Sequence, residues 1–275
     1  MLQYDLKALQ ERILGVLDAI DGVCRSHGLT YYLWAGTMLG AVRHKGFIPW
    51  DDDADIAMPR GDYDKLVAHP EWLPEPFELV CGELDDDYPL PFGKVQDAST
   101  TIIERMHLRF LGGIYIDVFP LDGVPEGAVA RRLQFAGYEF YKKILYFIYR
   151  DPYKHGHGMS SWIPLLCRRL FSRKGVQQTI ARLLHRYHYD DCAMVADYDD
   201  GMRGIIDKRV LGKPACYDFE GHRLMGVERY DEYLSTKYGD YMTIPKDSDR
   251  HQHKFHYVDL DCPYRNSQKE NGIAQ

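Results

Sequence analysis

A cluster of aspartates placed directly before an apolar segment restricts the fold of this chain more than any other feature. Four of the five residues at 51–55 are Asp, and Ile-Ala-Met follows at 56–58. Residues 53–58 alternate polar and apolar side chains, which is the period of a β-strand. On such a strand Asp53 and Asp55 share one face, while the apolar side chains pack behind them.

Two carboxylates on one strand face repel each other unless a cation lies between them. Mg²⁺ takes oxygen ligands and commonly shares one or two protein carboxylates with substrate phosphates. We therefore interpret Asp53 and Asp55 as ligands of Mg²⁺, with Mn²⁺ as the alternative ion. The competing interpretation is an ordinary acidic turn, and Asp51 and Asp52 are expected to be loop residues that cap or face solvent.

A metal site of this kind calls for a third carboxylate on a neighbouring strand. Asp117 meets this requirement because it stands between Ile116 and Val118 in "GIYIDVF". Glu104, in "TIIER", competes for the same place. Asp117 would act as a metal ligand or as the general base.

Gly36 and Thr37 lie between a predicted strand and a predicted helix, which is the setting of a phosphate seat. Backbone N–H groups at a helix N-terminus point at an anion, and glycine permits close approach. The alternative is that Thr37 simply caps the helix. Arg43, near the far end of that helix, is expected to reach a phosphate, and Lys94 is either a second phosphate ligand or a surface lysine on an edge strand.

The order of predicted elements indicates an α+β fold, with a mixed sheet and helices on one or both faces. An amphipathic helix is expected at 5–27, ended by Gly28, and a last helix at 226–240. A short helix is expected just after Gly36 and another at 60–69. Strands are expected at 31–35, 53–58, 77–81, 92–95, 100–104 and 112–120.

The middle of the chain is helical in pattern, basic and aromatic. Residues 131–186 hold twelve Lys and Arg against two acidic residues, so the rest of the chain, with a total of −7, carries −17. We predict three parts: a catalytic core at 1–126, a helical subdomain at 127–190, and a C-terminal segment at 191–275 that packs back on the core. The basic part favours an anionic partner or a membrane surface, and the alternative is an ordinary helical subdomain.

Cysteines and histidines add no motif of their own. The six cysteines are scattered without a C-x-x-C pair, which favours reduced thiols in the cytoplasm. No apolar run is long enough for a membrane span, and the N-terminus lacks a signal-peptide pattern. His251, His253 and His256 could ligate zinc if they alternate on a strand, or line an acceptor site, but a surface or packing role is favoured.

These features together resemble the nucleotidyltransferase fold, and more closely the LicD family of phosphotransferases. The segment "GTMLGAVRHKGFIPWDDDADIAMPRGDYDKL" is similar to the first block of that family, "YIDVFPLDGVP" to the second and "KYGDYMTIP" to the third. The resemblance implies that Asp53, Asp55 and Asp117 bind the metal, with Asp51 as an additional ligand in a D-x-D-x-D row. Ala54 stands where the family usually has a larger aliphatic residue.

The resemblance also implies an activity. Such enzymes move phosphocholine or a related phospho-alcohol from a CDP-activated donor, such as CDP-choline, to a teichoic acid, lipopolysaccharide or capsule, and CMP leaves. A CDP-ribitol or CDP-glycerol transferase is one alternative, and a nucleotidyltransferase that uses an NTP and releases pyrophosphate is another. A non-catalytic binding module is disfavoured by the three carboxylates, and a nucleic-acid partner by the acidic remainder. The expected location is the cytoplasm, or the inner face of the cell membrane through 131–186.

Overall fold

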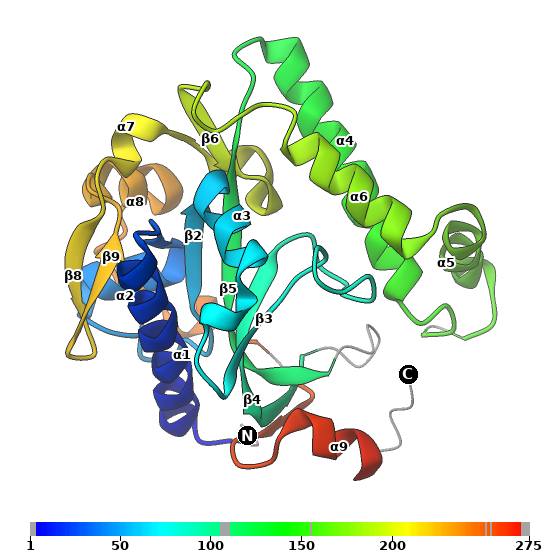
Figure 1. Cartoon of the computed structure of the whole chain (residues 1–275), viewed down its shortest axis with the longest axis horizontal. Helices are drawn as coiled ribbons and strands as arrows, with labels where there is room; N and C mark the ends of the chain where they lie inside the picture. The colour runs from blue at the N-terminus through cyan, green and yellow to red at the C-terminus, as the bar shows by residue number, and fades with distance from the viewer. Residues whose placement is uncertain (1–3, 105–110, 155, 251, 254, 271–275) are drawn as a thin grey trace.

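The protein is described from a computed structural model, which covers residues 4–104, 111–154, 156–250, 252–253 and 255–270. In this part of the chain ten strands form one mixed sheet, in the order β10-β4-β5-β2-β1-β9-β8. Strand β3 pairs with β4, while β6 and β7 continue the sheet from the end of β5 (Figure 1). The strands are β1 (Tyr32–Leu33), β2 (Asp55–Pro59), β3 (Phe77–Val80), β4 (Gly93–Ile103), β5 (Gly112–Gly123), β6 (Met194–Asp197), β7 (Ile205–Asp207), β8 (Ala215–Phe219), β9 (His222–Gly226) and β10 (Tyr257–Asp259).

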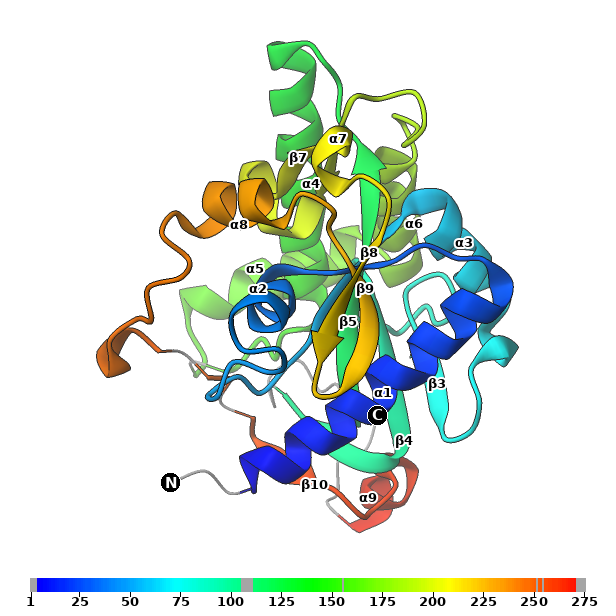
Figure 2. The ribbon, with the colours of Figure 1, turned by 90° about the vertical axis from the view of Figure 1, so that its left-hand side faces the viewer.

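Helices cover both faces of this sheet. The α-helices are α1 (Leu6–His27), α2 (Ala35–Arg43), α3 (Arg60–Ala68), α4 (Ala128–Tyr149), α5 (Met159–Leu170), α6 (Arg173–Leu184), α7 (Lys208–Leu211), α8 (Tyr230–Tyr238) and α9 (Tyr264–Glu270), and the 3₁₀ helices are η1 (Pro70–Trp72), η3 (Tyr198–Gly204) and η4 (Asp247–Asp249). Figure 2 shows α1 and α3 on one side of the strands and α2 and α8 on the other. The expected α+β fold is therefore confirmed.

The first helix shows how local chemistry sets an element. The Asp5 side chain accepts hydrogen bonds from the backbone N–H groups of Lys7 and Ala8, and Gly28 ends the helix with a φ of 66°. Its buried side chains recur at helical spacing and pack on the sheet; they include Leu9, Ile13, Leu17 and Ile20. The prediction of a helix over 5–27 is confirmed to within one residue.

The region predicted as separate strands at 92–95 and 100–104 is one long strand. β4 runs from Gly93 to Ile103, and its pairing with β5 shifts register between Asp97 and Ile102. Such a bulge adds residues to one strand without ending it. Asp, Ala and Ser at 97–99 are poor strand formers, and the pairing with β5 overrides that tendency.

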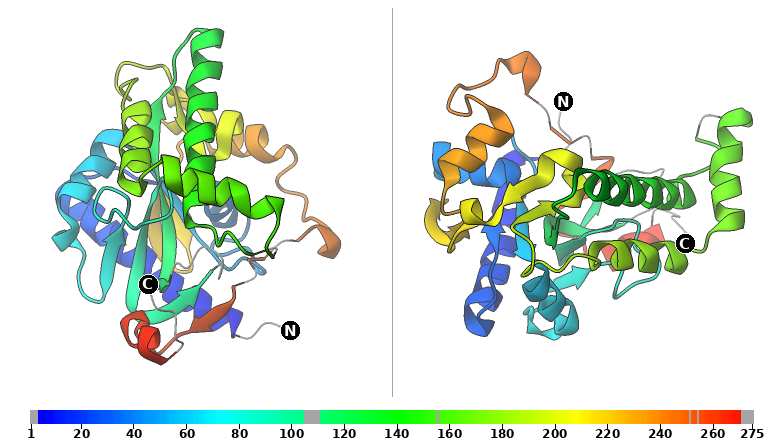
Figure 3. Two further views of the ribbon diagram at one scale, coloured as in Figure 1. Left: turned by 90° about the vertical axis from the view of Figure 1, so that its right-hand side faces the viewer. Right: turned by 90° about the horizontal axis from the view of Figure 1, so that it is seen from above.

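Residues beyond 126 form a helical layer and then return to the sheet. α4 packs against α5 and α6, and a second apolar cluster lies among them, including Phe135, Ile144 and Ile180. The C-terminal part supplies β6 to β10, which pair with β5, β1 and β4 or with one another. Figure 3 shows α5 at the far end of α4, away from the sheet. Among the described residues, no helix has the length and apolar character required to cross a membrane.

Candidate active site

The register of the sheet brings two carboxylates and a lysine into one row. β2 runs parallel to β5 with Asp55 opposite Asp117, and β5 runs antiparallel to β4 with Asp117 opposite Lys94. Residues that are paired in this way project to the same face of a sheet. Asp53 and Ala54 precede β2, so the strand begins at Asp55 and not at residue 53 as predicted. Asp53 therefore approaches the row from a loop.

The carboxyl group of Asp55 lies in an unfavourable environment for a lone negative charge. Burial, and then the charges of Asp53 and Asp117, raise the pKa of Asp55 well above its usual range. Burial, followed by the charge of Asp53, also raises the pKa of Asp51 to about 8. A folded protein that gathers carboxylates in this way stores repulsion that a bound cation would relieve.

Asp117 differs from Asp55 because it has a cationic neighbour. The ammonium group of Lys94 donates to Oδ1 of Asp117 at 2.6 Å, and Lys94 is only 1% exposed. Burial raises the pKa of Asp117 to about 6, although Lys94 opposes this shift. The interpretation of Lys94 as a surface lysine on an edge strand is wrong, because β4 lies inside the sheet between β10 and β5.

Lys94 is enclosed by other groups of the site. Its ammonium nitrogen lies 3.2 Å from the centre of the Tyr115 ring and 3.8 Å from Glu104. The hydroxyl of Tyr115 in turn donates to Glu104 at 3.1 Å. Glu104 therefore lies beside Lys94, at one end of the row. Asp117 is the carboxylate that lies beside Asp55.

The start of α2 faces the aspartate loop, as a phosphate seat requires. A Cβ atom added to Gly36 would lie 3.2 Å from Oδ2 of Asp51, so glycine allows a close approach here. The Thr37 hydroxyl accepts from the backbone N–H of Asp55 at 2.8 Å. The residue that precedes the helix as N-cap is Trp34, so the alternative of Thr37 as an N-cap is wrong. Thr37 instead joins α2 to β2.

Asp52 has a structural role that the expectation of a solvated loop residue missed. It is 1% exposed, and it accepts hydrogen bonds from the Tyr4 hydroxyl and from the backbone N–H of His253. The His253 ring lies 3.0 Å from Asp52 and 3.6 Å from Asp53. The hydrogen bond with Asp52 raises the pKa of His253 to about 9. Asp52 therefore connects Tyr4, near the start of the chain, to His253, near its end.

Two of the other predicted residues lie away from the row. The Arg43 guanidinium donates to the Tyr241 carbonyl at 2.7 Å, and to the His44 ring at 2.9 Å. It thus ties the end of α2 to the segment after α8. His256 precedes β10 and is exposed. Neither His253 nor His256 lies on a strand, so the idea of alternating histidines on one strand face is wrong for these two; His251 lies outside the described residues.

The donor set suits a divalent cation. Asp52, Asp53 and His253 each offer a ligand atom within 4.8 Å of the other two, which makes them one candidate set of metal ligands. The Asp55–Asp117 row with Asp53 offers oxygen atoms alone, which is the preference of Mg²⁺. The raised pKa values of Asp55 and Asp117 indicate that the row holds less positive charge than its carboxylates require. The residues present therefore fit a hard divalent ion.

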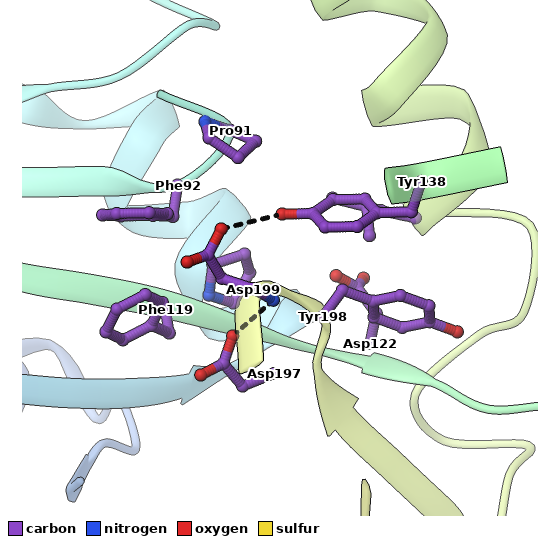
Figure 4. Close-up of a pocket in the computed structure, with 10 residues that line it drawn as sticks. Pro91, Phe92, Phe119, Asp122, Tyr138, Asp197, Tyr198 and Asp199 are labelled. Atoms are coloured by element: carbon purple, nitrogen blue, oxygen red, sulfur yellow. Dashed lines mark hydrogen bonds between the residues drawn. The ribbon is translucent and has the colours of Figure 1, made fainter. Parts of the chain in front are cut away.

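A hollow lined by aromatic and acidic side chains adjoins the row (Figure 4). Phe119 follows Asp117 by two residues on β5, so it lies on the same face about 6.6 Å along the strand. The Phe92 ring packs on it with centroids 4.5 Å apart. Figure 4 shows these two rings opposite Tyr138, with Asp199 and Asp197 between. The hollow is narrow, with a free volume of about 10 Å³, which is close to the minimum for one water molecule.

Asp197 lies beside this region and was not predicted, because no motif in the sequence marks it. It lies opposite Leu121 in the β5–β6 pairing, so it shares the face of Asp117, and it is 5% exposed. The Trp34 indole donates to it at 3.3 Å. Burial, followed by the charge of Asp199, raises the pKa of Asp197 to about 7. Trp34 also lines a larger cavity of about 170 Å³ between β7 and α8.

Comparison with known proteins shows which proteins this chain is similar to. Residues 28–122 match the LicD/FKTN/FKRP nucleotidyltransferase domain. This stretch contains α2, the aspartate loop, β2, β4 and most of β5. The row and the helix that faces it therefore lie inside the matched domain.

Individual relatives agree with the domain match. The chain is 28% identical to the lipopolysaccharide cholinephosphotransferase LicD of Haemophilus influenzae over 269 residues, which cover 92% of this chain and 97% of that protein. It is 41% identical to the human ribitol 5-phosphate transferase FKRP over 56 residues, or 19% of this chain and 10% of that protein. An uncharacterized protein of Rickettsia prowazekii is 50% identical over 100 residues, or 36% of this chain and 35% of that protein. On these matches, residues 28–122 resemble the LicD-type nucleotidyltransferase domain, and nearly the whole chain is similar to the cholinephosphotransferase LicD.

Proposed function

We propose that this transferase moves a phospho-alcohol from a CDP-activated donor to a hydroxyl group of a cell-surface glycan and releases CMP. The observation that carries the proposal is the pairing of Asp55 with Asp117 on adjacent parallel strands. This pair faces the start of α2, and it lies within the matched domain. Carboxyl groups whose pKa values are raised by burial and by one another are expected at functional sites.

We propose that the divalent cation binds Asp53, Asp55 and the oxygen of Asp117 that does not accept from Lys94. Asp51, in the same acidic loop, is the additional ligand. Bound there, the ion would draw negative charge from the phosphoryl oxygens. Gly36 lets the donor diphosphate approach the N–H groups of α2. Lys94 holds Oδ1 of Asp117, so we assign it to positioning that carboxylate and not to binding phosphate.

Transfer then requires little covalent chemistry from the protein. The acceptor hydroxyl attacks the phosphorus of the phospho-alcohol in line with the leaving CMP, and the chain supplies positioning and charge. As the alternative to its role as a metal ligand, we propose that Asp117 takes the hydroxyl proton, because burial lifts its pKa to about 6.

We propose choline as the alcohol. The LicD relative that spans almost this whole chain is named a cholinephosphotransferase. The hollow beside Asp117 combines the faces of Phe92 and Phe119 with the buried carboxyl of Asp197, and a quaternary ammonium group is attracted to both. Because the hollow is narrow, the choline head requires Tyr138 or the 197–199 turn to move outward.

Ribitol is the second candidate, since the short FKRP match falls on a named ribitol 5-phosphate transferase. A polyol carries no charge, so it gains nothing from Asp197 beyond hydrogen bonds. The third candidate activity is that of a nucleotidyltransferase, in which an acceptor attacks the α-phosphate of CTP and pyrophosphate leaves. The three candidates differ in product or donor and can be separated directly.

The test is incubation of the purified chain with Mg²⁺ and CDP-choline, CDP-ribitol, CDP-glycerol or CTP, with a glycan extract as acceptor. Mass spectrometry reads CMP, pyrophosphate and the modified glycan. We expect CMP and phosphocholine-modified glycan from CDP-choline alone, and no product with EDTA. Pyrophosphate from CTP would replace the proposal with the third candidate. Release of CMP from CDP-ribitol alone would change the alcohol and leave the site intact.

A further inference from the structure

The outer face of α5 is unusually apolar for a surface helix. Trp162 is 76% exposed, Leu166 55% and Leu170 64%, and these three residues follow one another at four-residue spacing. Residues at this spacing lie on one side of a helix. Ile163, 53% exposed, borders the same stripe. An apolar stripe of this kind commonly marks an interaction site.

The inner side of α5 is attached to the protein. Ser161 is buried, and Cys167 packs against the second apolar cluster. The Arg168 guanidinium donates to the carbonyls of Ile148 and Arg150, at the end of α4. The helix is therefore held in place with its apolar stripe outward, and Figures 1 and 3 show it at the edge of the molecule beyond α4.

Positive charge accompanies the apolar side chains. α5 has two arginines and no acidic residue, and Arg169 is exposed. α4 repeats the pattern, because Leu133 and Phe140 are exposed on the helix that also exposes Arg132 and Lys143. Large apolar groups interleaved with cations are the pattern of helices that lie in the interface of an anionic bilayer.

We propose that α5, supported by the exposed face of α4, docks the enzyme on an anionic lipid bilayer. At 12 residues, α5 is about 18 Å long, so it would lie in the plane of the interface. An anionic polymer would account for the arginines but not for four exposed large apolar residues. Helix α4 connects this surface to the hollow, because its Tyr138 and Lys142 contact Asp199 there.

The test uses the full-length protein and extruded vesicles of phosphatidylcholine with or without phosphatidylglycerol. We expect co-flotation with the anionic vesicles, weaker binding to phosphatidylcholine alone, and partial loss of binding as salt is raised. Trp162 is 76% exposed and Trp34 is 1% exposed, so a blue shift and quenching by brominated lipid are expected from Trp162. The variant Trp162→Phe should keep binding and lose most of that signal.

The variant Trp162→Ser/Leu166→Ser/Leu170→Ser should bind anionic vesicles about tenfold more weakly or worse, since each side chain loses its apolar transfer energy. A control is Leu84→Ser, which removes an apolar residue that is 46% exposed outside α4 and α5 and should leave binding unchanged. Both variants should release CMP from the donor at the parent rate in a vesicle-free assay, so failure of docking is distinguishable from failure of the proposed activity.

Three outcomes would overturn the proposal. One is a wild-type protein that does not float with anionic vesicles, and another is a triple-serine variant that binds as tightly as the parent. The third is a concentration-dependent dimer that the triple substitution dissociates, which would assign the stripe to contact between two copies of the chain.

Discussion

Strand β5 carries two buried aspartates whose surroundings differ sharply. Asp122 is 1% exposed and is paired with Arg60, whose Nε and Nη2 donate to its two oxygens at 2.7 and 2.6 Å. Asp117, five residues earlier and on the opposite face, shares its surroundings with Asp53 and Asp55, and Lys94 is its close cation. Burial alone therefore does not separate structural from functional carboxylates. The balance of charge does, because the Asp122 pair is complete and the Asp55–Asp117 row is not.

The largest expected effect comes from Asp55→Asn. Removal of this carboxylate should lower CMP release by about 10³-fold, because the cation would lose a ligand worth several kcal/mol of charge stabilisation. The free energy of unfolding without Mg²⁺ should be unchanged or higher, because a repelling buried charge is removed. Chemical denaturation and donor turnover measure the two quantities. Asp18→Asn, at an exposed position on α1, is the control, and an active Asp55→Asn enzyme would refute the site.

The contrasting change is Asp122→Asn. It leaves the Arg60 guanidinium buried without a counter-ion, so it should lower the free energy of unfolding by about 3–5 kcal/mol. The activity per folded molecule should remain near that of the parent. Urea denaturation and turnover at low temperature check both parts. A stable but inactive variant would place Asp122 in the site and break the comparison between the two aspartates.

A smaller effect is expected at Asp197, which tests the choline hollow. Asp197→Asn keeps the contact with Trp34 but removes the negative charge, so the KM for CDP-choline should rise about tenfold. The KM for a donor whose alcohol is uncharged, such as CDP-ribitol, should not change if that donor is used at all. Equal effects on both donors would remove Asp197 from recognition of the alcohol.

The pKa of Asp197 adds a stability readout to the same variant. Its folded pKa of about 7 lies above its ordinary value of 3.8, so ionisation at higher pH opposes folding. Relative to Asp197→Asn, the parent should lose stability as the pH rises from about 4 through 7, with little further change above that window. A difference that is independent of pH would contradict the assigned burial.

The smallest effect is expected for Thr37→Val. The substitution keeps the shape of the side chain but removes the oxygen that accepts from the Asp55 N–H. Loss of this bond should cost about 1–3 kcal/mol of stability, with a modest fall in turnover as β2 loosens from α2. Thr37→Ser retains the hydroxyl and is the matched control. If the two variants have the same free energy of unfolding, the hydroxyl does not have this role.

Local chemistry was sufficient for much of the fold. Helix α1 has its cap, its period and its terminal glycine in contiguous sequence, and the pattern predicted it to within one residue. The acidic loop, the apolar strand after it and "YIDVF" were also visible as local signals. By contrast, Asp53 was predicted on the strand and lies before it, because pairing with β5 begins at Asp55.

The sequence by itself determined which chemical groups this protein brings to the candidate site: the aspartates at 51–55, Asp117, and a glycine in the first turn of a short helix. Only the tertiary structure decided how these groups are paired. It set Asp55 beside Asp117, buried Lys94 against that carboxylate, and tied Asp52 to His253 about two hundred residues away in the chain. It also placed Asp197 on the same face through β6. Register and long-range pairing depend on the free energy of the whole sheet, which no local pattern contains.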